Sequence, residues 1–270
     1  MRKLILPLLA LCMFAGSVKA QNYFDDKWFD KPVKHRISYT NERYRIKKIV
    51  RNNYWTVFEV MYNEPYRIGG WMCMEHTIRL KDQDTDREYY MINSTGIPKE
   101  PDRFDFKESG PVEKLITLWF PPLPETVKTI TLIGGEMSFY DVALSSVKPQ
   151  LTEGIRTVTA PSHVSKDPNL KLDRVITDNN YTMLHLTYTA PNTTSVNISM
   201  GTTLADPATG KSYKLLKCGG IPASPKRLYL QKGSTLSFSL IFQALPATVK
   251  KVKMVESLVG NWDINNIILE

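Results

Sequence analysis

Four acidic side chains alternate along one short segment and invite comparison with a calcium site, because hard cations bind several carboxylate oxygens. Counted from the first of them, the sixth position is Arg87 instead of glycine and the twelfth is Asn93 instead of glutamate, so the EF-hand pattern fails. We therefore predict an acidic hairpin loop, no metal site and no cofactor. The acidic residues are Asp82, Asp84, Asp86 and Glu88.

The histidines form no zinc-site pattern, because they lie far from one another in the sequence. His185 stands in the middle of an expected strand, between Leu184 and Leu186. If those leucines pack inward, the alternation of a strand places His185 on the opposite face, where we expect it to face solvent. The histidines are His35, His76, His163 and His185.

Motifs for catalysis are equally scarce. The chain has no Gly-x-Ser-x-Gly elbow, and Gly69 and Gly70 lack the Gly-Lys-Ser/Thr run and the helix of a phosphate loop. We therefore predict no catalytic residues and a protein that is not an enzyme. A triad assembled from distant residues is the alternative that spacing leaves open, since catalytic groups meet in space.

Three aromatic residues form the sharpest candidate binding site. Tyr62, Tyr66 and Trp71 surround a turn rich in Gly and Pro. The chain contains an internal repeat, and the segment at the matching position of the second copy, 190–194, has no aromatic residue. A feature of one segment that its relative lacks is not required by the fold, so we predict an exposed aromatic platform for a sugar or a peptide. The other tryptophans that fall in or beside expected strands are assigned to the core: Trp55, Trp119 and Trp262.

These candidates sit within an internal repeat, with one block at about 46–144 and the other at about 172–269. Residues 56–62 align with 182–188, and both segments alternate and end in Tyr. The order of the matches is preserved throughout, so we predict one folding unit present twice. The other matches are Gly96-Ile97-Pro98 with Gly220-Ile221-Pro222, and Leu123-Pro124 with Leu245-Pro246.

Each block is typical of strands. Residues 182–188 and 235–242 place β-branched and aromatic side chains on alternate faces, as half-buried antiparallel strands require. Residues 82–87 and 206–211 have the composition of hairpin loops. Six or seven short strands in about 100 residues, without an amphipathic helix, predict an all-β fold of two tandem immunoglobulin-like antiparallel β-sandwich repeats.

The expected boundaries follow from turn residues and composition. We assign 35–147 to the first sandwich repeat and 169–270 to the second. Residues 148–168, rich in Pro and polar side chains, are a linker with a possible first strand of the second repeat. Residues 21–34 form an aromatic and acidic N-terminal arm that is too short to fold alone.

Residues 1–20 have the features of a secretory signal peptide: a basic start, an apolar run and a small-residue exit at Ala20. The apolar run at 4–16 is shorter than the roughly twenty residues that span a bilayer, so a retained anchor is the weaker alternative. Lipidation at Cys12 is another alternative, but its neighbours Leu11 and Met13 are large. We expect export to the periplasm, the cell surface or the extracellular space, with no integral membrane segment after processing.

Charge and cysteine content narrow the partners. The formal net charge is +8, and removal of Arg2, Lys3 and Lys19 with the signal leaves about +5. The basic residues are scattered, so we predict no nucleic-acid partner. Only Cys73 and Cys218 remain in the mature chain, and we expect free, buried thiols instead of a disulfide scaffold.

The segments 204–213 and 242–250, together with Gly220-Ile221-Pro222, make the chain resemble immunoglobulin-like modules of unknown function in bacterial lipoproteins and envelope proteins. The resemblance covers both repeats and rests on a hairpin turn and a strand-ending Leu-Pro. It implies non-enzymatic, extracytoplasmic modules, and it carries over no functional residue.

These observations lead to the hypothesis of a non-catalytic extracytoplasmic binding or assembly module of a bacterial cell envelope that acts through protein–protein contacts. Sheet edges and end loops would receive an envelope protein. The alternative hypothesis is a glycan-binding protein that uses the aromatic loop of the first repeat to hold a surface glycan.

Overall fold

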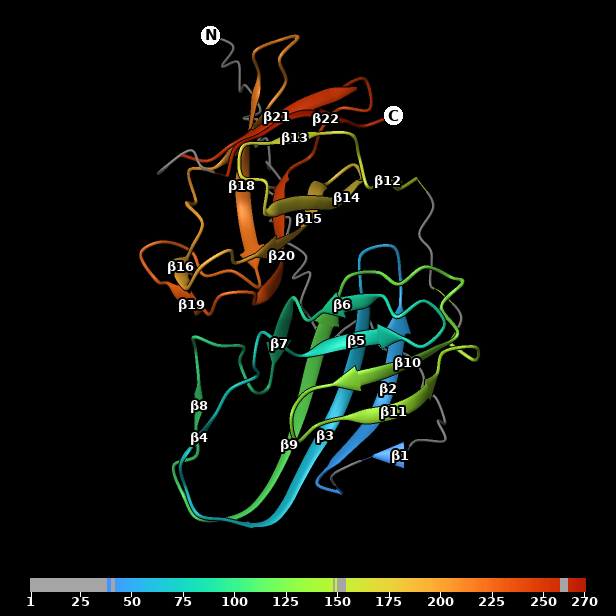
Figure 1. Ribbon diagram of the computed structural model, residues 1–270, viewed down its shortest axis with the longest axis vertical. Coiled ribbons are helices and arrows are strands. Elements are labelled where there is room, and N and C mark those ends of the chain that lie inside the picture. Colours follow the sequence, from blue (N-terminus) through green and yellow to red (C-terminus); the bar gives the residue numbers. More distant parts are fainter. Residues whose placement is uncertain (1–37, 40–41, 148, 150–153, 258–261) are drawn as a thin grey trace, which may run out of the picture. The chain divides into compact units, whose positions relative to one another are not determined.

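The computed structural model describes residues 38–39, 42–147, 149, 154–257 and 262–270, and their strands pair antiparallel in an all-β fold (Figure 1). The expected all-β class is thus confirmed. The expected signal peptide at 1–20, the arm at 21–34 and Cys12 lie outside the described residues. Within the described part of the chain, no helix has the length and apolarity needed to cross a membrane.

The N-terminal half of the described chain contains two main sheets that share one core. Phe58 and Leu118 from the first sheet and Leu80, Ile130 and Phe139 from the second are fully buried in a single hydrophobic cluster, which makes this half sandwich-like. The first sheet has the order β2 (Tyr44–Arg51), β3 (Thr56–Arg67), β9 (Gly110–Phe120), β7 (Asn93–Thr95). The second has the order β1 (Ser38–Tyr39), β11 (Phe139–Ala143), β10 (Thr129–Ile133), β5 (Arg79–Asp82), β6 (Glu88–Tyr90). The short strands β4 (Trp71–Met72) and β8 (Phe104–Asp105) form a separate pair.

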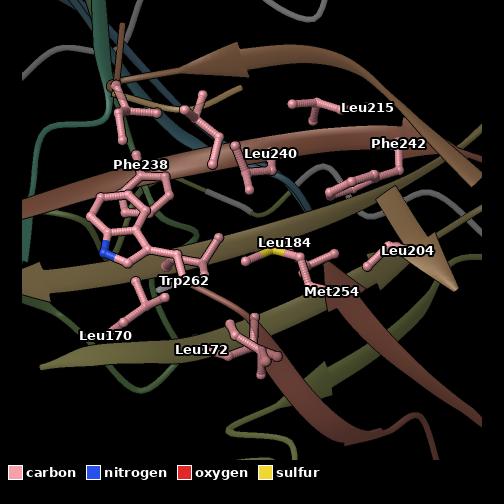
Figure 2. Packing of buried hydrophobic residues seen from close by; sticks show 14 of the residues in the cluster. Leu170, Leu172, Leu184, Leu204, Leu215, Phe238, Leu240, Phe242, Met254 and Trp262 are labelled. Atoms are coloured by element: carbon pink, nitrogen blue, oxygen red, sulfur yellow. The ribbon is translucent and has the colours of Figure 1, made fainter. Parts of the chain in front are cut away.

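The C-terminal half folds one long ladder of strands around a second core. Figure 2 shows Leu172, Leu184, Leu240 and Met254 turned toward a common interior, and Trp262 stacks on Phe238 with ring centroids 5.4 Å apart. The ladder has the order β12 (Arg156–Thr159), β14 (Leu170–Thr177), β15 (Tyr181–Thr189), β20 (Thr235–Gln243), β18 (Ser212–Gly219), β17 (Thr203–Ala205), β21 (Lys251–Val255), β22 (Ile264–Ile268), β13 (Val164–Ser165). The pair β16 (Thr194–Val196) and β19 (Leu228–Leu230) is separate.

The order of strand pairing recurs between the halves. The order β1-β11-β10-β5-β6 has its counterpart in β13-β22-β21-β17-β18, and β2-β3-β9-β7 has its counterpart in β14-β15-β20-β18. One difference is that β18 is continuous and pairs with both β17 and β20, whereas β6 and β7 are separate strands. A continuous strand that changes partners along its length turns one ladder into two layers.

The Leu-Pro step is held in the same way in both halves. The backbone N–H of Leu123 donates to the Thr56 hydroxyl over 3.1 Å, and that of Leu245 donates to the Thr182 hydroxyl over 3.1 Å. Both leucines are buried, as the sequence predicts. Each Leu-Pro step is therefore tied to the start of a long central strand, at the first residue of β3 or the second residue of β15.

The two expected hairpin loops are confirmed. The loop between β5 and β6 is closed by a hydrogen bond from the Thr85 hydroxyl to Asp82 over 2.5 Å. The loop between β17 and β18 is closed by the Thr209 hydroxyl and Asp206 over 2.7 Å. Asp and Thr three residues apart thus stabilise each turn through the side chain, as Asp does in many tight turns.

Polar contacts join the two halves, which belong to one compact unit, Lys31–Glu270. The ammonium group of Lys99 donates to the carbonyl oxygens of Met91, Ile92 and Gly220. The Lys226 ammonium and the Asp102 carboxylate form an ion pair of 2.9 Å. Since Lys99 is buried, its three carbonyl partners replace the water that the ammonium group loses.

His185 contradicts its expected exposure, because it is only 2% exposed. Its Nε2 lies 3.1 Å from the carbonyl oxygen of Tyr54, and its Nδ1 lies 2.7 Å from the Ser239 hydroxyl. The Trp55 ring meets the imidazole edge-on with centroids 5.0 Å apart. The outward face of β15 is therefore covered by the turn between β2 and β3, which the alternation of a single strand does not reveal.

Candidate binding surface

The turn after β3 carries the most exposed cluster of large hydrophobic side chains in the described chain. Tyr66 is 64% exposed, Ile68 is 81% exposed and Trp71 is 55% exposed. Gly69 and Gly70 both have positive φ, which lets the chain turn sharply between the end of β3 and β4. Tyr66, Ile68 and Trp71, together with the neighbouring Arg67 and Arg103, are named the Trp71 surface.

Arg67 holds this turn in one conformation. Its Nε donates to the Gly69 carbonyl over 3.1 Å, and its Nη2 donates to the Trp71 carbonyl over 3.2 Å. Its guanidinium carbon also lies 4.2 Å from the centre of the Phe106 ring, a cation–π contact. Arg67 therefore orders the turn from below while the hydrophobic side chains beside it stay in water.

The pairing of β4 with β8 places a second arginine beside the tryptophan. Trp71 stands opposite Asp105 in this ladder. The guanidinium carbon of Arg103 lies 5.9 Å from the centre of the Trp71 ring, and its Nε is 3.2 Å from an Asp105 carboxylate oxygen. The exposed indole thus has a charged, hydrogen-bonding rim.

Tyr62, the third aromatic residue of the expected platform, is buried instead of exposed, with 1% exposure. Its ring packs on Tyr44 with centroids 5.0 Å apart, and its hydroxyl donates to Glu64 and accepts from Arg67. The hydrogen bond from Tyr62 holds the pKa of Glu64 below its usual value. Tyr62 shares the inward face of β3 with Phe58, so it supports the turn and offers no ring face to a ligand.

A counterpart of the Trp71 surface occurs on the pair β16 and β19. Ser195 stands opposite Tyr229, which is 76% exposed. The Arg227 guanidinium donates to the Ser195 hydroxyl over 3.3 Å. An exposed aromatic residue and an arginine thus recur here, with the aromatic residue on the other strand of the pair.

Sequence comparison of the two turns misses Tyr229, because the aromatic residue has moved to the partner strand. Arg227 follows Pro225 by the same two residues by which Arg103 follows Pro101, so Tyr229 takes the place of Asp105. That alignment is the signal by which Tyr229 could have been found.

No protein family model matches this chain, and no curated protein matches it. Its functional interpretation therefore depends on the geometry of the chain's own residues.

The acidic run has partners within the chain. Asp82 is buried and closes its turn, Asp86 pairs with Lys81 over 2.7 Å, and Glu88 pairs with Arg79 over 2.7 Å. Across the described ranges, no three His, Cys, Asp or Glu side chains lie together as a metal site requires. Three of the four acidic side chains are thus used in turn and strand contacts.

The two cysteines of the described chain are free and partly buried. Burial raises the pKa of the Cys73 thiol and of the Cys218 thiol. A thiol with a raised pKa carries little thiolate at neutral pH and is a weak nucleophile. Their environments favour packing over reactivity.

Proposed function

We propose that the chain is a non-catalytic, extracytoplasmic binding or assembly module of a bacterial cell envelope, and that the Trp71 surface is its contact with a protein partner. The signal-like segment 1–20 supports export. The observation that carries the proposal is a turn that exposes three large hydrophobic side chains to water while two hydrogen bonds from the partly buried Arg67 hold its backbone.

We also propose that the fold consists of two tandem immunoglobulin-like sandwich repeats. The recurring order of strand pairing and the matched contacts of Leu123 and Leu245 support this duplication. Two antiparallel sheets over one core in each half fit the immunoglobulin-like class. A duplicated module offers two similar surfaces for assembly, at Trp71 and at Tyr229.

The chemistry of the Trp71 surface favours a protein over a sugar. Trp, Tyr and Arg are the residues enriched at the energetic centres of protein interfaces. Ile68, the most exposed of the three hydrophobic residues, adds aliphatic area that a sugar cannot use as well as an apolar side chain can. Binding of a partner would remove this area from water, which the hydrophobic effect favours.

A surface glycan is the second candidate, and the exposed indole of Trp71 is the observation that favours it. A sugar ring stacks on one open face of an aromatic side chain. Arg103 lies near this ring and supplies a hydrogen-bond donor for a sugar hydroxyl or carboxylate. On this alternative the contact is polar at its rim and needs Trp71 but not Ile68.

Replacing Trp71 by alanine is expected to weaken binding of the envelope partner by at least about tenfold, because interface tryptophans at such sites contribute about 2 kcal/mol or more. The wild-type chain is used to isolate its partner from envelope extracts, and affinities are then measured with the purified partner. Tyr140→Ala is the matched control, since Tyr140 is also exposed, at 44%, but lies on β11.

The same variants separate the two candidates. Loss of protein binding in both Trp71→Ala and Ile68→Ala supports the protein contact. Specific binding on a glycan array that is lost in Trp71→Ala but kept in Ile68→Ala favours the glycan. Equal affinity of Trp71→Ala, Tyr140→Ala and the wild type for every ligand found would refute the proposed role of this surface.

A further inference from the structure

A small cleft lined by both halves of the compact unit Lys31–Glu270 has the charge of an anion site. Its volume is about 200 Å³, smaller than the roughly 300–1,000 Å³ of sites for drug-sized ligands. Its lining shares no residue with the Trp71 surface, so a ligand here is independent of the proposed function. The charged and aromatic lining includes Arg87, Glu88 and Tyr89 from the N-terminal half and Lys171, Asp173 and Arg174 from the C-terminal half.

Cationic side chains exceed the carboxylates that could neutralise them. Arg87, Lys171 and Arg174 line the cleft. Glu88, one of its two carboxylates, is already paired with Arg79 over 2.7 Å. Asp173 is therefore the single carboxylate left in the lining for three cationic groups.

Asp173 is already engaged by another residue of the lining, Thr187. Its carboxylate accepts a hydrogen bond from the Thr187 hydroxyl over 2.5 Å. Burial raises its pKa, and the Thr187 hydrogen bond and the nearby cations oppose that effect only in part. Within the described residues, Asp173 forms no direct ion pair with Arg87, Lys171 or Arg174, so one carboxylate at longer range offsets the charge of the three cationic groups only in part.

Arg174 shows most clearly that the cationic groups of the cleft outnumber the carboxylates that could pair with them. Its guanidinium is partly buried on β14, and no hydrogen bond or ion pair joins it to another residue in the described ranges. Burial, together with the like charge of Arg87, lowers the pKa of Arg174. Half-buried guanidinium groups are normally paired, because their five N–H donors lose water on burial.

Arg87 is placed to act with Arg174. Its guanidinium carbon lies 5.2 Å from the centre of the Tyr89 ring, and Tyr89 also lines the cleft. A cation–π contact of this kind positions a guanidinium without using its N–H donors. Among the described residues, the side-chain N–H donors of both arginines have no partner, and the two like charges repel each other. An anion that lies between them stabilises both.

We infer that this cleft binds the oxyanion group of a small ligand, a carboxylate or a phosphate, through Arg87 and Arg174. Guanidinium groups match both oxyanions with paired N–H donors, and the small volume suits a single charged group with little attached to it. The ligand bridges the two halves, because the arginines come from β14 and from the loop between β5 and β6.

Titration of the full mature chain with two probes tests this site. Inorganic phosphate and acetate are added separately at constant ionic strength, with sodium chloride as the reference, and the arginine side-chain N–H signals are followed by NMR. We expect saturable shifts with at least one probe and none with chloride. The probe that binds more tightly identifies the oxyanion as a phosphate or a carboxylate.

Two variants and one control decide the assignment. Arg174→Gln and Arg87→Gln should each weaken binding by at least about tenfold, as loss of a charge-assisted hydrogen bond does. Arg45→Gln, at an exposed arginine on β2, should bind as the wild type does. If Arg174→Gln fails to fold, the exposed Arg87 still provides the test. Absence of saturable binding, or equal binding by wild type and both cleft variants, would overturn the site.

Discussion

We expect the replacement of Leu245 by alanine to lower the free energy of unfolding by about 2–5 kcal/mol, the range of cavity-forming core substitutions. Leu245 is 4% exposed and belongs to the buried cluster of the C-terminal half. Its backbone N–H is bound to the Thr182 hydroxyl, so the backbone cannot easily move to fill the cavity. Urea titration of the full chain measures the change, and the slope of the unfolding free energy against urea concentration is compared between variants.

Lys250→Ala is the control in the same measurement. The Lys250 side chain is 62% exposed, and its ion pair with Glu270 at 3.3 Å lies at the surface. Surface substitutions and exposed ion pairs change stability by less than about 0.5 kcal/mol in most cases. A larger loss in Lys250→Ala than in Leu245→Ala would show that the Leu-Pro segment is a functional surface instead of a packing element.

Acidification from pH 7 to pH 5 should lower the free energy of unfolding by about 1–2 kcal/mol through His185 alone. Burial, with a smaller effect of the Arg174 charge, lowers the pKa of His185 from 6.5 to about 3. The unfolded chain therefore binds a proton at His185 near pH 6.5, whereas the folded chain binds it only near pH 3. Stability is full above the unfolded pKa and falls as the pH drops through this window.

The variant His185→Gln isolates this effect. Glutamine keeps an N–H donor for the Tyr54 carbonyl but does not titrate. Chemical denaturation at pH 7, 6 and 5 should show a free energy of unfolding that depends less on pH in the variant than in the wild type. Identical slopes for the two proteins would show that His185 is accessible to protons in the folded state.

The recurring local features of the fold could be predicted from sequence because each depends on neighbouring residues. The hairpin loop that begins at Asp82 and its match at Asp206 are short-range turns with side-chain closure. Burial of Leu123 and Leu245 follows from the shared Leu-Pro pattern. These features repeat in both halves, so one copy supports the interpretation of the other.

Three residues were predicted wrongly or missed: His185, Tyr62 and Tyr229. Their positions depend on contacts between residues distant in sequence, or on which face of a strand a side chain occupies. His185 is buried by Tyr54 and Trp55, which come from the other half of the described chain. Tyr62 is buried because it continues the inward face of β3, an alternation that the sequence does contain. Tyr229 is an exposed aromatic residue whose pairing with Ser195 is visible only once β16 and β19 are formed.

The Trp71 surface combines a predictable part and an unpredictable one. The Gly pair and the aromatic residues at 66 and 71 mark an exposed turn in the sequence. The role of Arg67, which binds two carbonyl groups of that turn and stacks on Phe106, depends on the position of β8 and the residue after it. The Trp71 surface differs from an ordinary loop because hydrogen bonds hold its backbone while its large hydrophobic side chains stay exposed.

Site-specific photocrosslinking tests the proposed protein contact most directly. Ile68, which is 81% exposed, is replaced by a photoreactive phenylalanine analogue in the exported full-length chain, and Leu216, which is 46% exposed on β18, is replaced in a matched control. After illumination of whole cells, we expect a discrete adduct with one envelope protein from position 68 and none from position 216. The same adducts from both positions, or no protein adduct from position 68, would contradict the assignment of the Trp71 surface as a protein-binding site.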